Sequence, residues 1–309
     1  MASCETELWN LVREIEPSQT QKDGAARSHN YLREILCSGQ MASRIVDDYL
    51  SGSYSRDTAI KPLDDVDIIF VIDPTKWLTG LDSLLSLNPE PSAVLTTFAN
   101  AIRYRYPISS IYGQRRSVRL ELFHLDIDVV PAINVDRTGN FILIPDRNAG
   151  NWIKSSPKRH SDNATSVNTI RNGKFKPLVK LLKHWNGNLP STAMFKSFAI
   201  ETIAVRLFKT AQYQTLEEGL MKFFDFIAYV AEEKTVLRWR DSCGIDLSWL
   251  ECNIPDAAET GSNTAAGVDS ERKKRFIENA IRSRNKMIEA QNAYSTDTAC
   301  RRITEALRI

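Results

Sequence analysis

Four aspartates stand in two motifs of the chain, each an acidic pair with one residue between its members. Asp65 and Asp67 open an apolar run at 68–72, and Asp126 and Asp128 lie within "LDIDVVP". Residues i and i+2 of a strand point to the same face, so each pair projects both carboxylates to one side. Neighbouring carboxylates repel each other unless a cation neutralises them, and Mg²⁺ prefers oxygen ligands. The alternative interpretation is that each motif merely marks a solvated strand end.

The second acidic strand, placed antiparallel beside the first, would add a third carboxylate to the site. Three carboxylates can hold two divalent ions about 3.5–4 Å apart. Such ions lower the pKa of an attacking hydroxyl and neutralise a leaving pyrophosphate, which is the chemistry of nucleotidyl transfer. The motif "GSYSRDT" precedes the first acids. Gly52 permits a positive φ and a close backbone approach, and Ser53 offers a hydroxyl and an N–H at a turn that could cradle phosphate.

The elements that must position these residues follow from hydrophobic spacing and turn signals. In the first half, the pattern predicts helices at 3–16, 28–50 and 91–106, and strands at 67–72, 108–112, 117–124, 125–133 and 141–145. Beyond about residue 163, it predicts helices at 167–187, 191–210, 215–233 and 271–308, with an exposed or partly disordered loop at 255–270. The layout is an N-terminal α/β part followed by a mostly helical part.

Composition limits the possible classes of protein. The 309 residues are 42% hydrophobic, which suffices for a sizeable core, and 40 basic against 38 acidic residues argue against coating nucleic acid by bulk charge. The five cysteines form no CxxC pair and the four histidines are scattered, so a zinc site is not expected. The odd cysteine count and the lack of a signal peptide favour a reducing cytoplasm, and no apolar run approaches the roughly 20 residues of a membrane span.

The motif "GSYSRDTAI…DDVDI", followed by "DIDVVPA", resembles the polymerase-β-like nucleotidyltransferases. More narrowly, the chain resembles the cGAS/DncV-like nucleotidyltransferases (CD-NTases) of bacterial antiphage (CBASS) signalling. The likeness covers residues from about 45 to 300 and continues in four further segments: "WIKSSPKRHSDNATSVN", "LVKLLKHWN", "FKSFAIETI" and "NIPDAAETGSNTAAGV". The resemblance implies an α+β fold, with a polymerase-β-like core of mixed or antiparallel sheet and flanking helices. It places this core in residues 1–160, a helical lobe in 161–309, and the active site in the cleft between them.

The resemblance also assigns metal ligands. Asp65, Asp67 and Asp128 would hold two Mg²⁺ ions, with Mn²⁺ as a possible substitute. Asp128 is preferred to Asp126 because it directly precedes "VVPA", as the family's third acid does. Its second implied role is to help activate the attacking sugar hydroxyl.

Nucleotide-binding residues are implied in the same way. Gly52 and Ser53 would hold the donor triphosphate, while Lys183 and Ser197 would contact its phosphates. Lys180, one helical turn before Lys183, is a weaker candidate. The alternative for both lysines is the solvated face of an amphipathic helix. In 103–119, five arginines including Arg119 alternate with tyrosines; they could stack on bases, but a solvated helix end and hairpin is the favoured interpretation.

The activity that the resemblance implies is Mg²⁺-dependent synthesis of a cyclic di- or trinucleotide second messenger from nucleoside triphosphates, ATP among them, with release of pyrophosphate. One alternative is a nucleotidyltransferase that extends RNA ends or another acceptor, like CCA-adding or antitoxin-like relatives. Another is a catalytically inactive nucleotide-binding module, against which the three intact acids argue. HORMA-type or conjugation proteins are the implied regulators, no membrane is involved, and activation by nucleic acid is not indicated because zinc-ribbon cysteines are absent.

Overall fold

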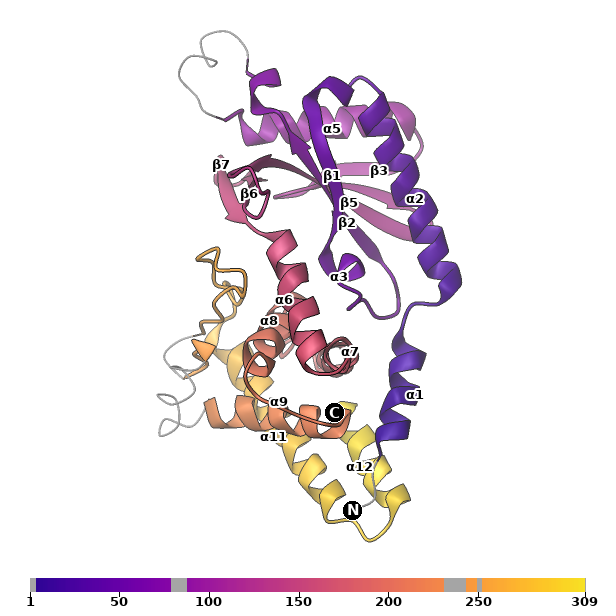
Figure 1. The fold of residues 1–309 in the computed structure, drawn as a ribbon, viewed down its shortest axis with the longest axis vertical. Helices are drawn as coiled ribbons and strands as arrows, with labels where there is room; N and C mark the ends of the chain where they lie inside the picture. Colours follow the sequence, from indigo (N-terminus) through magenta and orange to yellow (C-terminus); the bar gives the residue numbers. More distant parts are fainter. Residues whose placement is uncertain (1–3, 79–87, 231–242, 249–251, 309) are drawn as a thin grey trace. The chain divides into compact units, whose positions relative to one another are not determined.

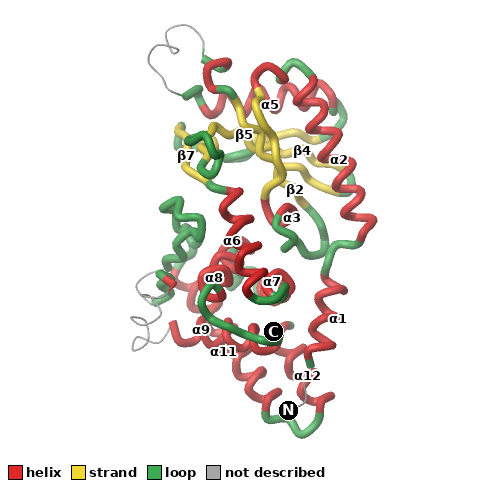
Figure 2. Tube along the Cα trace, viewed as in Figure 1, coloured by secondary structure: helices red, strands yellow, loops and turns green. Residues whose placement is uncertain are grey.

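The computed structural model describes residues 4–78, 88–230, 243–248 and 252–308, and it forms two compact units. Residues 17–161 make the core unit, whereas the segment up to residue 16 and the chain from 162 onward make the helical unit. Figure 2 shows that the strands belong to the first of these units and that the second is built of helices and loops. The sequence placed residues 1–16 with the core; they group instead with the helices.

The core unit is a mixed sheet with two long helices, which confirms the predicted α+β class (Figure 1). Its helices are α2 (Gln19–Ser38), the short α3 (Gly52–Ser55) and α5 (Pro91–Arg105). Its strands are β1 (Ile45–Ser51), β2 (Asp65–Ile72), β3 (Ser110–Gly113), β4 (Val118–Leu122), β5 (Leu125–Asn134), β6 (Ile142–Asp146) and β7 (Asn151–Ser155). The strand order is β1-β2-β5-β4-β3, and β6 pairs with the far end of β5 and with β7.

The two acidic strands are neighbours, but β2 and β5 run parallel to each other. The antiparallel placement predicted from the sequence is therefore wrong. β5 has its antiparallel neighbour in β4, to which only Phe123 and His124 connect it. A two-residue connection of this kind is the shortest link between antiparallel strands, whereas parallel neighbours need a long crossover.

Alternation along β2 assigns its two faces. Val66, Ile68 and Phe70 are buried in the same apolar cluster as Leu32 of α2 and Phe98 of α5. Since successive side chains of a strand point to opposite faces, the intervening Asp65 and Asp67 face away from this cluster. The apolar residues thus anchor the sheet to its helices and leave the other face for the acids.

One predicted helix of the core unit is wrong in its second half. The pattern at 28–50 suggested a single helix, but α2 ends at Ser38 with Gly39 as its C-cap. Residues 45–51 form β1, which pairs antiparallel with β2. The segment contributes β-branched and aromatic residues to the sheet, and this pairing overrides a helical spacing that those residues also fit. Strand β7 was not predicted at all.

The helical unit contains α1 (Glu5–Ile15), most of α6 (Pro157–Ile170), and α7 (Phe175–Asn188), α8 (Ser197–Phe208), α9 (Leu216–Val230), α11 (Ser270–Gln291) and α12 (Thr296–Leu307). Two long predicted helices are each divided. The pattern at 167–187 is interrupted where Asn172 and Gly173 adopt positive φ, which a helix does not allow. The pattern at 271–308 is interrupted after Gln291. The end of the predicted helix 215–233 lies outside the described residues.

The stretch 255–270 is not the exposed loop that its composition suggested. Asp256, Ala258 and Ala265 are buried. Arg206 of α8 donates hydrogen bonds to the carbonyl oxygens of Pro255 and Asp256, the latter at 3.0 Å. Side-chain hydrogen bonds to the backbone therefore replace regular secondary structure in fixing this segment.

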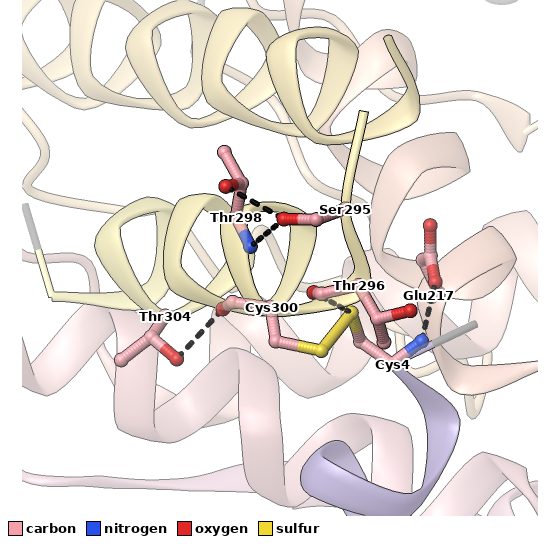
Figure 3. The surroundings of a disulfide bond; sticks show 7 residues. All are labelled: Cys4, Glu217, Ser295, Thr296, Thr298, Cys300 and Thr304. Atoms are coloured by element: carbon pink, nitrogen blue, oxygen red, sulfur yellow. Dashed lines mark hydrogen bonds between the residues drawn. A yellow bond between two sulfur atoms is a disulfide. The ribbon is translucent and has the colours of Figure 1, made fainter. Parts of the chain in front are cut away.

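Cys4 and Cys300 form a disulfide between the N-cap of α1 and α12, with a Cα–Cα distance of 5.3 Å (Figure 3). The expectation that the cysteines are thiols of a reducing compartment is wrong for this pair. Cys37, Cys243 and Cys252 are free. Among the described helices, none combines the length and the apolar character that crossing a membrane requires.

Candidate active site

The parallel pairing of β2 and β5 brings the four aspartates together. Asp65 lies opposite Asp126, and Asp67 lies opposite Asp128. Because neighbouring strands are about 4.8 Å apart and alternate residues share a face, the four side chains form a two-by-two block on the face opposite α2 and α5. The three predicted ligands Asp65, Asp67 and Asp128 thus lie on one face of one unit.

The carboxylates of Asp65 and Asp67 have no hydrogen bond or ion pair with any residue in the described part of the chain. Burial and the neighbouring charges of Asp65 and Asp128 raise the pKa of Asp67 to about 7, and the charge of Arg56 opposes this rise. Desolvation and then the charge of Asp128 raise the pKa of Asp65 as well. The two carboxylates therefore carry more negative charge than the protein compensates, and a cation would relieve it.

Gly52 stands directly beside this block. It begins α3 with a φ of 70°, and the preceding Ser51 is in register with Asp67. A Cβ atom at position 52 would lie 1.9 Å from Oδ2 of Asp67, so no other residue fits without displacing that carboxylate. The sequence-based expectation of a positive φ and a close approach is confirmed. Ser53 follows in the first turn of α3, where its carbonyl oxygen accepts a hydrogen bond from the Thr58 amide at 3.0 Å.

Asp126 and Asp128 differ from the first pair because Arg119 of β4 binds both. Arg119 is in register with Asp128 and donates from Nε to Oδ1 at 3.0 Å and from Nη2 to Oδ2 at 2.6 Å. Its Nη1 donates to Oδ2 of Asp126 at 3.1 Å. The hydrogen bonds to Asp128, followed by the carboxylate charges, raise the pKa of Arg119. The sequence analysis assigned Arg119 to a solvated hairpin or to base stacking; it lies instead against the third acid.

The next acid on the same face also has a partner. Glu121 lies opposite Asp126, and its Oε1 accepts a hydrogen bond from the Tyr112 hydroxyl at 2.7 Å. Tyr112 is in register with Arg119, so a single row across the sheet runs from Asp67 through Asp128 and Arg119 to Tyr112. Hydrogen-bond donors thus face the acids toward the β3 edge, whereas no such donor faces Asp65 and Asp67 of β2 in the described part of the chain.

The donor set fits a divalent cation by its chemistry. In the described residues, no three acidic, histidine or cysteine side chains already converge on one point. Two unpartnered carboxylates with raised pKa values nevertheless adjoin a third, and carboxylate oxygens are the ligands that Mg²⁺ and Mn²⁺ take. The residues that would hold such an ion are Asp65, Asp67 and Asp128.

The predicted phosphate-binding residues of α7 and α8 lie in the helical unit. Lys183 is 4% exposed, and its Nζ lies 2.9 Å from Oε2 of Glu201, which is equally buried. Lys180 is also buried, and its Nζ lies 2.8 Å from Oε1 of Glu16. The alternative of a solvated helix face is therefore wrong for both lysines. Ser197 is exposed at the first position of α8, where backbone N–H groups lack helical partners.

Comparison with known proteins places this site in a family. The model of the "Second Messenger Oligonucleotide or Dinucleotide Synthetase domain" matches residues 2–168, more than half of the chain. A cyclic AMP-AMP-AMP synthase of an Acinetobacter strain is 31% identical over 287 residues, which are 89% of this chain and 76% of that protein. A cyclic AMP-AMP-AMP synthase of Escherichia coli is 26% identical and covers 57% of this chain and 55% of that protein.

Solved structures share the fold over nearly the whole chain. The structure of Escherichia coli CdnC with ATP has a TM-score of 0.73 at 18% identity, covering 99% of this chain and 98% of that one. The structure of the Bradyrhizobium diazoefficiens CD-NTase CdnG with GTP has a TM-score of 0.70 at 12% identity, covering 98% and 97%. At these sequence identities, the similarity to the two solved structures shows a shared fold and no more.

Proposed function

Because the chain belongs to the Second Messenger Oligonucleotide or Dinucleotide Synthetase family, the cGAS/DncV-like nucleotidyltransferases, we propose that it converts ATP into a cyclic trinucleotide and releases pyrophosphate. The single observation that carries the chemistry is the register of Asp67 with Asp128 beside the unpartnered Asp65. The choice of ATP and of a cyclic trimer rests on the activity of the Acinetobacter relative, a cyclic AMP-AMP-AMP synthase.

In this proposal, Asp65, Asp67 and Asp128 hold divalent ions, two Mg²⁺ or in their place Mn²⁺. Such ions supply charge neutralisation of the leaving pyrophosphate and a lowered pKa of the attacking hydroxyl. Asp128 has a second role as the group that helps take the proton of this hydroxyl. The backbone at Gly52 and the hydroxyl and N–H of Ser53 hold the donor triphosphate, because a side chain at position 52 would close the approach to Asp67.

The helical unit contributes Lys183 and Ser197 to the phosphates. Ser197 is supported by its exposed place at the start of α8, since the N-terminus of a helix favours anions. Lys183 contacts Glu201 at 2.9 Å, and because an ammonium group has three donors, a contact with a phosphate oxygen is compatible with this ion pair. Glu201 then orients the ammonium group.

Regulation and biological role follow from the relatives. Escherichia coli CdnC, whose fold this chain shares, has been solved in a complex with a HORMA protein. We therefore include a HORMA-type regulator among the partners of this chain, and conjugation of the enzyme as a second mode of control. The product would act as a second messenger in antiphage defence, and the cytoplasm, where nucleoside triphosphates are made and used, is its place of synthesis.

Product analysis tests the proposal directly. Purified protein is incubated with each labelled ribonucleoside triphosphate, alone and mixed, in the presence of Mg²⁺, and the products are treated with phosphatase. A phosphatase-resistant product with the mass of cyclic tri-AMP is the expected result. Nucleotides added only to RNA ends would support the RNA-extending alternative and overturn the proposal, and nucleotide binding without any product would support an inactive module.

A further inference from the structure

The guanidinium of Arg119 holds the third acid of the site in one orientation. Its Nε and Nη2 donate to the two different carboxylate oxygens of Asp128, at 3.0 Å and 2.6 Å, so the contact is a two-point pair. A guanidinium and a carboxylate that meet in this way fix each other's plane, which a single hydrogen bond does not do. Asp128 is only 7% exposed, so little water competes for these oxygens.

The same guanidinium also sets the neighbouring acid. Nη1 of Arg119 lies 3.1 Å from Oδ2 of Asp126, so one cation binds the second acidic pair. Among the residues that the structure describes, none forms a hydrogen bond or ion pair with the carboxylates of the first pair, Asp65 and Asp67. A carboxylate has about four lone-pair positions, and Arg119 uses one on each oxygen of Asp128. The Ser117 hydroxyl approaches Oδ1 of Asp128 at 3.5 Å as a second donor, so a metal ion would take a lone-pair position that these two donors leave, above all on Oδ2.

Within the function proposed above, we propose that Arg119 is the positioning residue of the divalent-cation site. It orients Asp128 as a ligand and offsets enough negative charge for four carboxylates to share one face of the sheet. Hydrogen bonds to ligating carboxylates are a general means of orienting ligands, and their loss typically lowers metal affinity by about 10–100-fold. Arg119 itself contacts neither substrate nor ion in this proposal.

The test measures cation binding without nucleotide, so that its result does not depend on which product the enzyme makes. Mn²⁺ is titrated into the full chain and followed by electron paramagnetic resonance for the wild type, Arg119→Lys and Arg119→Gln. Arg116→Gln is the matched control, because it removes the same charge three residues away, where Arg116 contacts Asp146 and none of the four acids. Thermal melting in chelator establishes that each variant is folded.

We expect both Arg119 variants to bind Mn²⁺ about 10–100-fold more weakly than the wild type, and the control to bind it equally well. Arg119→Lys is decisive, because it keeps the charge but loses the two-point geometry. Wild-type affinity in Arg119→Lys would reduce the role of Arg119 to charge alone and overturn the proposal. Tighter binding in Arg119→Gln would show that Arg119 competes with the ion, which also overturns it. If Arg119→Gln does not fold, the lysine variant alone decides.

Loss of Mn²⁺ affinity without any cyclic product in the wild type would sustain this inference while refuting the proposed function. Cyclic product from the wild type together with unchanged Mn²⁺ affinity in both variants would support the proposed function and refute the role of Arg119. A second readout is the Mg²⁺ concentration that gives half-maximal turnover. This Mg²⁺ concentration rises in the Arg119 variants if Asp128 is mispositioned. A purely structural defect would lower the amount of active enzyme but leave this Mg²⁺ concentration unchanged.

Discussion

The acids of β2 and the Lys183–Glu201 pair of the helical unit handle charge in opposite ways. Asp65 and Asp67 face each other's charge without a partner among the described residues, and their pKa values are raised. Lys183 and Glu201 are buried, 4% and 3% exposed, and their opposite charges lie 2.9 Å apart. The first arrangement leaves negative charge that a bound cation could neutralise. In the second, the two opposite charges lie beside each other within the protein.

The difference predicts where a substitution removes activity and where it removes stability. A carboxylate in the uncompensated block opposes folding in the absence of a cation, so its removal should leave the fold intact. A member of the buried pair should be needed for the fold, because its loss removes the close opposite charge from a buried ion. The two sites can therefore be separated by experiments that measure activity and stability side by side.

The largest effect is expected from Asp65→Ala combined with Asp67→Ala. Metal coordination contributes several kcal/mol to such transition states, so turnover should fall by about a thousandfold or more. The melting temperature in chelator should stay the same or rise, because two repelling carboxylates are gone. Product formation and calorimetry on the same samples provide the check. Wild-type turnover in this variant would refute the ligand assignment.

Glu201→Gln should destabilise the chain by about 3–5 kcal/mol, since it removes the carboxylate that lies 2.9 Å from the buried ammonium of Lys183. Glu271→Gln is the control, because Glu271 pairs with Arg275 at the surface, with side chains 61% and 43% exposed, and its loss should cost about 1 kcal/mol or less. Urea unfolding measures both. Replacing Lys183 and Glu201 together by Met should recover most of the stability.

That double replacement also tests the phosphate role of Lys183. If Lys183 contacts the donor phosphates, the restored fold will still show a raised KM for ATP. A double variant with both normal stability and normal KM would mean that Lys183 only stabilises the fold.

The pH dependence of stability in chelator should reveal Asp67. Its pKa is about 7 in the folded chain and about 4 in the unfolded chain. Between these values the folded state binds more protons than the unfolded state, so this residue makes stability fall as pH rises from about 4 to about 7, by about 2–4 kcal/mol. Asp67→Asn should remove that part of the slope when the two proteins are compared. A slope identical in both proteins would contradict the raised pKa.

The smallest effect on turnover is expected from Gly52→Ala, compared with Gly150→Ala. Both glycines have positive φ, 70° and 64°, so each substitution should cost about 1–2 kcal/mol of backbone strain. A Cβ at position 150 meets no atom within 4 Å, whereas at position 52 it meets the carboxylate of Asp67. Only Gly52→Ala should therefore lower turnover, by about tenfold or more if Asp67 is displaced. Equal turnover in the two variants would show that the close approach at Gly52 is unimportant.

Much of the site could be predicted from the sequence, because alternate residues of a strand share a face whichever way the neighbouring strand runs. Asp65 and Asp67 share a face whether β2 runs parallel or antiparallel to β5, so the wrong direction did not spoil the prediction of the shared face. The direction itself depends on how the intervening α5, β3 and β4 fold back, which local spacing does not specify. The same applies to residues 45–51, whose apolar spacing fits a helix until a partner strand is present.

The contact of Arg119 could have been predicted. Leu122 and Leu125 pair across a two-residue turn, and counting back along the hairpin places Arg119 opposite Asp128. The burial of Lys183 and Lys180 could not, because their partners Glu201 and Glu16 come from other helices, which no local pattern connects to them.

The bond between Cys4 and Cys300 turns almost the entire polypeptide into a covalent ring. The core unit, residues 17–161, is one uninterrupted arc of that ring. A protease that cuts the oxidised chain once within the ring, anywhere between the two cysteines, opens the ring but releases nothing, so the nicked molecule keeps its mass until a reductant separates the pieces. To free the core unit, two cuts are needed, one on each side of the arc.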